Sequence, residues 1–173
     1  MSEHGIAAGG DVRGGENESM TLVAWSGDLD KIWPALILGS TGAAYGMNVT
    51  IFFTFWGLFP LVRDDVRITG ADAMTKALAG MNRPGIGHMK LSKLNMAGMG
   101  PWMMRKLASD QKVAQPHELI EMCLELGVNL WPCEMSMDLL GLRKDQLIEG
   151  VGEPVGAATA LSEMSKSKIN LFI

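Results

Sequence analysis

The chain has 173 residues, enough for one domain with a substantial core and too few for two domains of ordinary size. Hydrophobic residues make up 47% of it and charged residues 20%, and the formal net charge is -4. This balance excludes an overall electrostatic attraction to nucleic acid, and we expect one globular domain that does not bind nucleic acid.

The cysteine and histidine content argues against two kinds of stabilising site. Two cysteines, Cys123 and Cys133, cannot form a disulfide framework, and the N-terminus lacks the pattern of a secretory signal. The three histidines lie at no metal-ligand spacing from a cysteine or from each other. We therefore expect a cytoplasmic protein without a metal or cofactor.

Residues 1–19 contain five glycines and almost no side chain that could enter a core. This composition predicts a disordered N-terminal tail. The folded domain is expected to cover residues 20–173.

The first part of the domain alternates between strand and helix signals. An apolar run at Met20–Trp25 predicts a strand, and apolar residues at helical spacing predict a helix that is capped by Asp28 or Asp30 and ends at Gly46. The run Asn48–Trp56 is rich in β-branched and aromatic residues without polar alternation, which predicts a second strand covered on both faces.

No charged residue lies between Lys31 and Arg63, a stretch longer than the roughly 20 apolar residues that a membrane-spanning helix needs. Glycines, prolines and Asn48 interrupt this stretch, so a helix followed by a buried strand explains it better. Membrane association through this region is the weaker alternative.

Residues 70–112 break the alternation with a basic, methionine-rich insertion. It contains seven methionines, and six Lys or Arg residues with no acid occur between Ala73 and Ser109. Methionine repacks readily against varied partners, so the insertion could form a docking surface. The alternative is a lid or a subunit contact that covers apolar core.

The C-terminal half returns to the alternating pattern. Helix and strand signals follow one another at Pro116–Leu126, Val128–Trp131, 136–148, Val151–Val155, Ala157–Met164 and Ile169–Ile173. This order predicts an α/β layered domain with a mostly parallel sheet of about five strands.

Cys133 is the strongest candidate for a reactive group. It follows the strand that ends near Trp131, and the next helix is expected to begin at Ser136 or Met137. Functional groups of a parallel sheet gather at this carboxyl edge, and backbone donors at a helix start favour a thiolate. Glu134 opposes this effect, because a neighbouring carboxylate disfavours a second negative charge. From position alone, reactive and inert roles stay equally open.

Cys123 is the second thiol, and it shares the apolar face of its predicted helix with Leu119, Ile120 and Leu124. The strand between the two cysteines spans roughly 15 Å, whereas a disulfide requires α-carbons within about 7 Å of each other. We expect Cys123 to pack in the core and not to pair with Cys133 without refolding.

The remaining candidates carry weaker signals. Asp138 is expected in the first turn of the helix after Cys133, where interaction with the N-terminal donors is favoured over acid-base work. His88 lies beside basic residues and could meet an anionic sulfur species, although a solvated surface position is the simpler interpretation. Gly39, Gly42 and Gly46 fall within a predicted helix rather than a strand-to-helix turn, so they indicate no nucleotide site.

Three separated segments resemble one family. Cys133–Asp138, followed by Gly141, looks like the cysteine motif of the second DsrE-like branch of the DsrE/DsrF/DsrH sulfurtransferase family. Phe52–Gly57 is similar to the second-strand signature of that branch, and Asn170–Ile173 resembles its terminal strand. The resemblance covers roughly residues 20–173.

The resemblance implies a three-layer α/β/α sandwich in which Cys133 becomes persulfidated and exchanges sulfur with small TusA-like or rhodanese-like proteins. It also implies a homo-oligomer, either a trimer or a hexamer. Cys123 falls where this branch often has a cysteine, so a role as a second functional thiol stays open.

The leading hypothesis is a sulfur carrier or sulfurtransferase that holds sulfane sulfur on Cys133. Whether such a carrier is an enzyme in its own right stays open. One alternative is a noncatalytic interaction module that uses the methionine-rich insertion. Another is a thiol-redox, peroxiredoxin-like protein in which Cys123 resolves an oxidised Cys133.

Overall fold

The computed structural model describes residues 18–66 and 83–173. Within these residues four parallel strands form one sheet, namely β1 (Ser19–Ala24), β2 (Asn48–Phe53), β3 (Asn129–Pro132) and β4 (Ile169–Phe172). Their order across the sheet is β3-β2-β1-β4. The two central strands are β1 and β2, which explains why both are continuous apolar runs.

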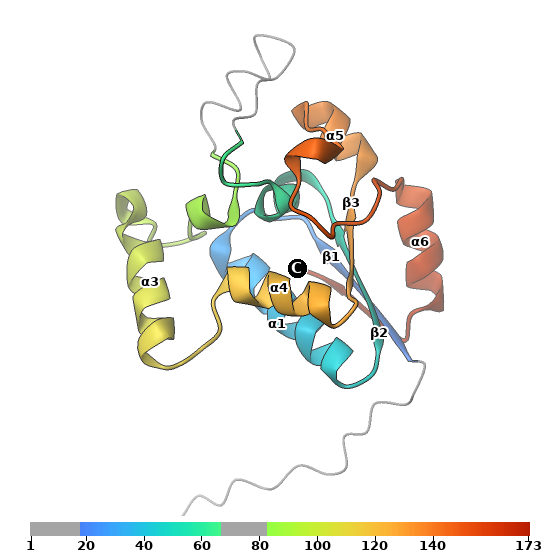
Figure 1. The fold of residues 1–173 in the computed structure, drawn as a ribbon, viewed down its shortest axis with the longest axis horizontal. Coiled ribbons are helices and arrows are strands. Elements are labelled where there is room, and N and C mark those ends of the chain that lie inside the picture. The colour runs from blue at the N-terminus through green and yellow to red at the C-terminus, as the bar shows by residue number, and fades with distance from the viewer. Residues whose placement is uncertain (1–17, 67–82) are drawn as a thin grey trace, which may run out of the picture.

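Helices cover both faces of this sheet (Figure 1). On one face α1 (Leu29–Ala44) packs beside α4 (Pro116–Glu125). On the other face lies α6 (Ala157–Lys166), whose Ala160 packs with side chains of β1 and β2. The predicted three-layer α/β/α architecture is therefore confirmed.

Two neighbouring residues of β2 belong to different apolar clusters, one on each face of the sheet. Side chains alternate along a strand, so Phe52 and Phe53 point to opposite faces of the sheet. Phe53 is buried in the main core beneath α1 and α4. Phe52 packs in a smaller cluster with Val23, Cys133 and Ala160 on the α6 face.

The sheet has four strands where the sequence pattern predicted about five. The segment Val151–Val155 makes only an isolated bridge, in which Val155 lies parallel to Cys133. Pro154 lacks a backbone N–H and cannot continue a ladder of hydrogen bonds, which explains why this segment does not extend into a strand.

The predicted helix over residues 136–148 is also shorter than expected. It is α5 (Glu134–Leu140), and Gly141 ends it in the left-handed conformation at φ 66°. A separate 3-10 helix, η4 (Lys144–Gln146), follows. The helix therefore begins two residues before the expected start and ends at the glycine.

The described part of the insertion forms η2 (Ile86–His88), η3 (Met96–Gly98) and α3 (Met99–Asp110). Figure 1 shows α3 standing apart from α1 and α4. This helix buries only Gly100, Pro101 and Ala108. Its exposed apolar side chains are Met99, Trp102, Met103, Met104 and Leu107.

Two sequence-based expectations reach beyond the described ranges. Most of the predicted disordered tail and part of the insertion, residues 1–17 and 67–82, lie outside them. As for the membrane question, none of the helices in the described ranges is both long and apolar enough to cross a bilayer. The cytoplasmic location stays a prediction.

Candidate functional site

The backbone of Cys133 is fixed at the carboxyl edge of the sheet. Its N–H donates to the Phe53 carbonyl at 2.8 Å, and the next N–H, from Glu134, donates to the Val155 carbonyl at 3.0 Å. Cys133 is the N-cap residue of α5, and its own carbonyl accepts from the Met137 N–H at 2.9 Å. The side chain thus starts from a position held by β2, α5 and the 151–155 segment.

The thiol of Cys133 is buried rather than open to solvent. The residue is only 6% exposed and packs with Val23, Phe52 and Ala160 between the sheet and α6. Its side chain makes no capping hydrogen bond to α5. The packing of α6 against the sheet therefore shields this sulfur from solvent.

A buried hydroxyl pair holds the first turn of α5 against the end of β2. The Oγ atoms of Ser136 and Thr54 lie 2.9 Å apart in a hydrogen bond, and Ser136 is buried. The sequence indicates Ser136 only as a possible helix start. It contains no signal for the hydrogen bond to Thr54, which joins segments far apart in the chain.

Cys123 lies in the other cluster, on the opposite face of the sheet. It is fully buried in the main core, and its Sγ contacts the Leu36 carbonyl of α1 at 3.8 Å. Burial raises the pKa of this thiol to about 11. The structure therefore keeps Cys123 apart from Cys133, in agreement with the expected core position.

Asp138 does not occupy the expected first turn. Because α5 begins at Glu134, Asp138 falls in the second turn, and Glu134 is the acidic residue of the first turn. The prediction for Asp138 was wrong because the helix starts earlier than the sequence pattern indicated. Glu134 takes that place beside the positive end of the helix dipole.

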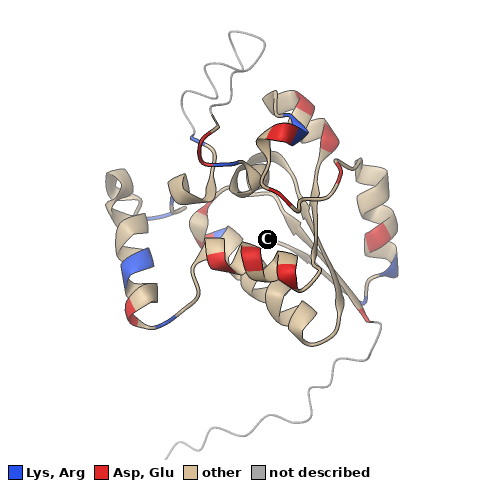
Figure 2. Cartoon of the chain, in the orientation of Figure 1, with Lys and Arg blue, Asp and Glu red and all other residues tan. Residues whose placement is uncertain are grey.

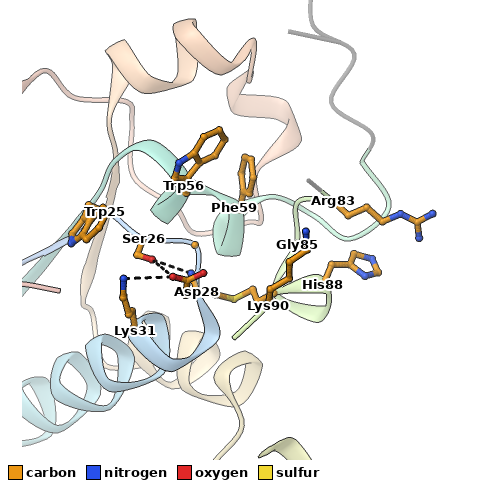
Figure 3. A pocket seen from close by; sticks show the side chains of 12 residues that line it. Trp25, Ser26, Asp28, Lys31, Trp56, Phe59, Arg83, Gly85, His88 and Lys90 are labelled. Atoms are coloured by element: carbon orange, nitrogen blue, oxygen red, sulfur yellow. Dashed lines mark hydrogen bonds and ion pairs between the residues drawn. The ribbon is translucent and has the colours of Figure 1, made fainter. Parts of the chain in front are cut away.

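A small pocket of about 210 Å³ lies at the carboxyl ends of β1 and β2 (Figure 3). Aromatic walls from Trp25, Trp56 and Phe59 enclose it. At its floor Lys31 lies 3.5 Å from the Asp28 carboxylate, and its ammonium lies 4.7 Å from the centre of the Trp25 ring. The charge of Lys31 is therefore compensated locally.

This pocket does not contain the candidate thiol. Cys133 is absent from its lining, and Figure 3 shows the side chains of Arg83 and His88 pointing away from its interior. Within the described residues, no three His, Cys, Asp or Glu side chains are grouped as metal ligands.

Comparisons with known proteins agree with this arrangement. Residues 16–172 match the model of the DsrE/DsrF/DrsH-like family. The chain is 38% identical to the uncharacterized protein YrkE of Bacillus subtilis over 158 residues, which cover 91% of this chain and 98% of YrkE. It is 36% identical to the sulfur carrier protein DsrE2 of Allochromatium vinosum over 163 residues, which cover 91% of this chain and 99% of DsrE2.

The matches span the sheet, the helices on both of its faces and the cysteine at its carboxyl edge. The matched range therefore includes both the α/β/α sandwich and the segment that contains Cys133. The chain therefore belongs to the DsrE/DsrF/DrsH-like family.

Proposed function

We propose that this protein is a sulfur carrier that holds sulfane sulfur as a persulfide on Cys133. The observation that carries the proposal is the position of this cysteine at the carboxyl edge, between the end of β3 and the start of α5. A sulfur-related role is supported by the family and by the similarity to a sulfur carrier protein.

The loading step is a thiolate attack on a sulfane sulfur. The Cys133 thiol first loses its proton to solvent, and the thiolate then attacks the outer sulfur of a donor such as thiosulfate. A new S–S bond forms at Cys133, the bond between the two donor sulfurs breaks, and sulfite leaves with the electron pair. The product is a persulfide anion that an acceptor thiolate can attack in turn.

Access to the thiol depends on α6. Only Ala160 of this helix is buried, so few apolar contacts hold it against the sheet. Elements with little buried surface open locally at lower free energy than the rest of the fold. We therefore propose that displacement of α6 exposes Cys133 to a donor or an acceptor.

The partners and the assembly belong to the same proposal. We expect small TusA-like or rhodanese-like proteins to deliver or accept the sulfur. We also expect a homo-oligomer, a trimer or a hexamer, because large apolar side chains of β4 and α6 are exposed in the single chain.

A noncatalytic interaction module is the second candidate function. The exposed apolar side chains of α3 favour it, because an isolated helix of 12 residues that buries so little of itself is marginally stable in water. This function predicts partner binding that survives the Cys133→Ala change. It also predicts no sulfur loading.

The thiol-redox alternative with Cys123 as resolving thiol gains no support from the geometry. The two cysteines lie in clusters on opposite faces of the sheet. A disulfide between them would require the sheet or α4 to rearrange.

Sulfur loading can be measured as a gain in intact mass. The reduced protein would be incubated with thiosulfate, polysulfide or a persulfidated carrier protein. We expect the wild type and Cys123→Ala to gain one sulfur that dithiothreitol removes, because the Cys133 thiolate forms the new S–S bond.

Cys133→Ala should gain nothing and is the decisive variant, with Cys123→Ala as its matched control. Peptide mapping would assign the added sulfur to the segment that contains Cys133. Absence of loading in the wild type with all three donors, or loading that persists in Cys133→Ala, would contradict the carrier function.

A further inference from the structure

A second and larger pocket lies between α3, the segment before it and the approach to α4. Its volume is about 740 Å³, which falls within the range of roughly 300–1,000 Å³ typical of small-molecule sites. The wall it shares with the smaller pocket is formed by His88, Met89 and Lys90. Figure 3 shows His88 directed away from the smaller pocket.

Among the described residues, the charged side chains that line this larger pocket are basic. They are Lys90, Arg105 and Lys106, with His88 beside them, and no acid of the described ranges belongs to the lining. Figure 2 shows basic residues on α3, which ends at the acidic Asp110, whereas α4 and α5 carry acidic residues. A basic cavity in a chain with a net charge of -4 indicates a ligand of opposite charge.

Arg105 lacks a direct carboxylate partner among the described residues. Its guanidinium donates to the carbonyls of Ile86 and Gly87, both at 2.9 Å, and both acceptors are neutral. Burial lowers the pKa of Arg105, and Asp64 only partly offsets this through space. A partly desolvated cation whose bonded acceptors are neutral is stabilised when an anion binds beside it.

Carboxylates from outside the lining contact residues of this pocket. Asp64 accepts a weak hydrogen bond of 3.4 Å from the Gly87 N–H, and Asp110 pairs with Lys106 at 3.3 Å on the exposed side of α3. Both side chains of that ion pair are more than half exposed, so an anion in the pocket can compete for Lys106.

Hydrogen bonds connect the walls, and one wall is aromatic. Asn95 accepts from the Leu91 N–H, and Gln115 donates to the Arg105 carbonyl, so the loop, α3 and the entry to α4 are tied together. Trp102 lines the same cavity and is 62% exposed. A flat or apolar group can therefore lie against the indole while an anionic group meets the cations.

We propose that this pocket binds a small organic molecule that bears a phosphate-type oxyanion. Arg105 and Lys106 contact the anion, and Trp102 contacts the flat or apolar organic group to which the anion is attached. The site is separate from Cys133 and does not depend on the sulfur-carrier function. The same oxyanion chemistry occurs in free inorganic anions and in organic phosphates.

Calorimetric titration of the full chain at low ionic strength tests the site with four probes. AMP is an organic phosphate, adenosine is the same nucleoside without the phosphate, and inorganic phosphate and thiosulfate are bare oxyanions. We expect AMP to bind and adenosine not to bind, and the affinity for AMP to fall as salt is added. Bare anions that bind as tightly as AMP would identify a free oxyanion as the ligand and would overturn the proposed contact between Trp102 and an organic group.

Two lysines offer a matched pair of charge reversals. Lys106 pairs with Asp110 on α3, and Lys166 pairs with Glu163 on α6, both in exposed helical positions. Lys106→Glu should weaken AMP or bare-anion binding about fivefold or more, and Lys166→Glu should leave it unchanged. Cys133→Ala should also bind normally.

Arg105→Gln should weaken binding further, with circular dichroism checking that α3 remains folded. Adenosine binding as tightly as AMP would overturn the proposal. So would an absence of binding by AMP and both bare anions, or equal effects of the Lys106 and Lys166 reversals.

Discussion

At the scale of single residues, the two cysteines differ in what surrounds them. Cys123 sits in the main core beneath α1, and burial raises the pKa of its thiol to about 11. Cys133 is also buried, but it lies at the carboxyl edge beneath a helix that buries only Ala160. Local opening can therefore expose Cys133, whereas Cys123 becomes accessible only when the core opens.

The raised pKa of Cys123 makes stability depend on pH in the alkaline range. Its ordinary value is 9.0, so between about pH 9 and pH 11 the unfolded chain has lost this proton and the folded chain keeps it. The contribution to the free energy of unfolding is complete below pH 9 and is lost as pH rises through 11. Its full size is of the order of 3 kcal/mol.

Urea denaturation between about pH 8.5 and 10.5 measures this loss of stability, because this range includes the ordinary pKa of a thiol. Cys123→Ala is the control, because it removes this thiol and leaves every other ionisable side chain in place. The wild type should lose stability with pH more steeply than this variant. Equal slopes would show that the burial of Cys123 has no such consequence.

At the scale of elements, one glycine sets how the 3-10 helix η1 (Phe55–Leu61) meets the sheet. The Gly57 N–H donates to the Trp25 carbonyl at 3.2 Å. A Cβ atom at Gly57 would lie 2.1 Å from the Ala24 carbonyl oxygen, which is too close for any side chain. This contact gives a physical reason for the glycine that ends the Phe52–Gly57 segment.

Gly57→Ala should lower the free energy of unfolding by about 2 kcal/mol or more, because backbone atoms of β1 must move to admit the methyl group. Gly156→Ala is the matched control, since no atom lies within 4 Å of the added Cβ there. At that N-cap position the change should cost less than about 1 kcal/mol. Denaturant unfolding of both variants compares them, and equal losses would argue against the close contact.

At the scale of the whole molecule, the sheet ends in an exposed apolar strand. Among the described strands β4 pairs only with β1, and its large apolar residues are Ile169, Leu171 and Phe172. Phe172 is 70% exposed. Natural proteins rarely leave such an edge uncovered, because it can pair with another chain.

We expect the wild type to have the mass of several chains in light scattering, and Phe172→Glu to reduce that mass. The substitution places a charge on the exposed edge, where another copy would have to desolvate it. Met122→Glu, at an exposed position of α4, is the control and should leave the assembly intact. A wild type that elutes as a single chain would refute the proposed homo-oligomer.

Most of the elements, and the position of Cys133 between a strand and a helix, follow from the amino-acid sequence. Apolar runs at residues 20–25 and 48–56 predict buried central strands, and helical spacing predicts α1 and α4. The second strand is shorter than predicted, because it ends at Phe53 and the 3-10 helix η1 begins at Phe55. Cys133 could be placed at a strand end because strand, proline and helix signals follow one another there. These features depend on local propensity and periodicity, and both can be read from one segment of the chain without its neighbours in space.

Which side chains meet depends on how the elements pack in three dimensions. It buries the Cys133 thiol under α6, joins Ser136 to Thr54, and brings Arg105 to the carbonyls of Ile86 and Gly87. It also reduces the expected fifth strand to a single bridge at Val155. Such contacts join segments far apart in the sequence, and their geometry depends on how whole elements pack rather than on the pattern within any one of them.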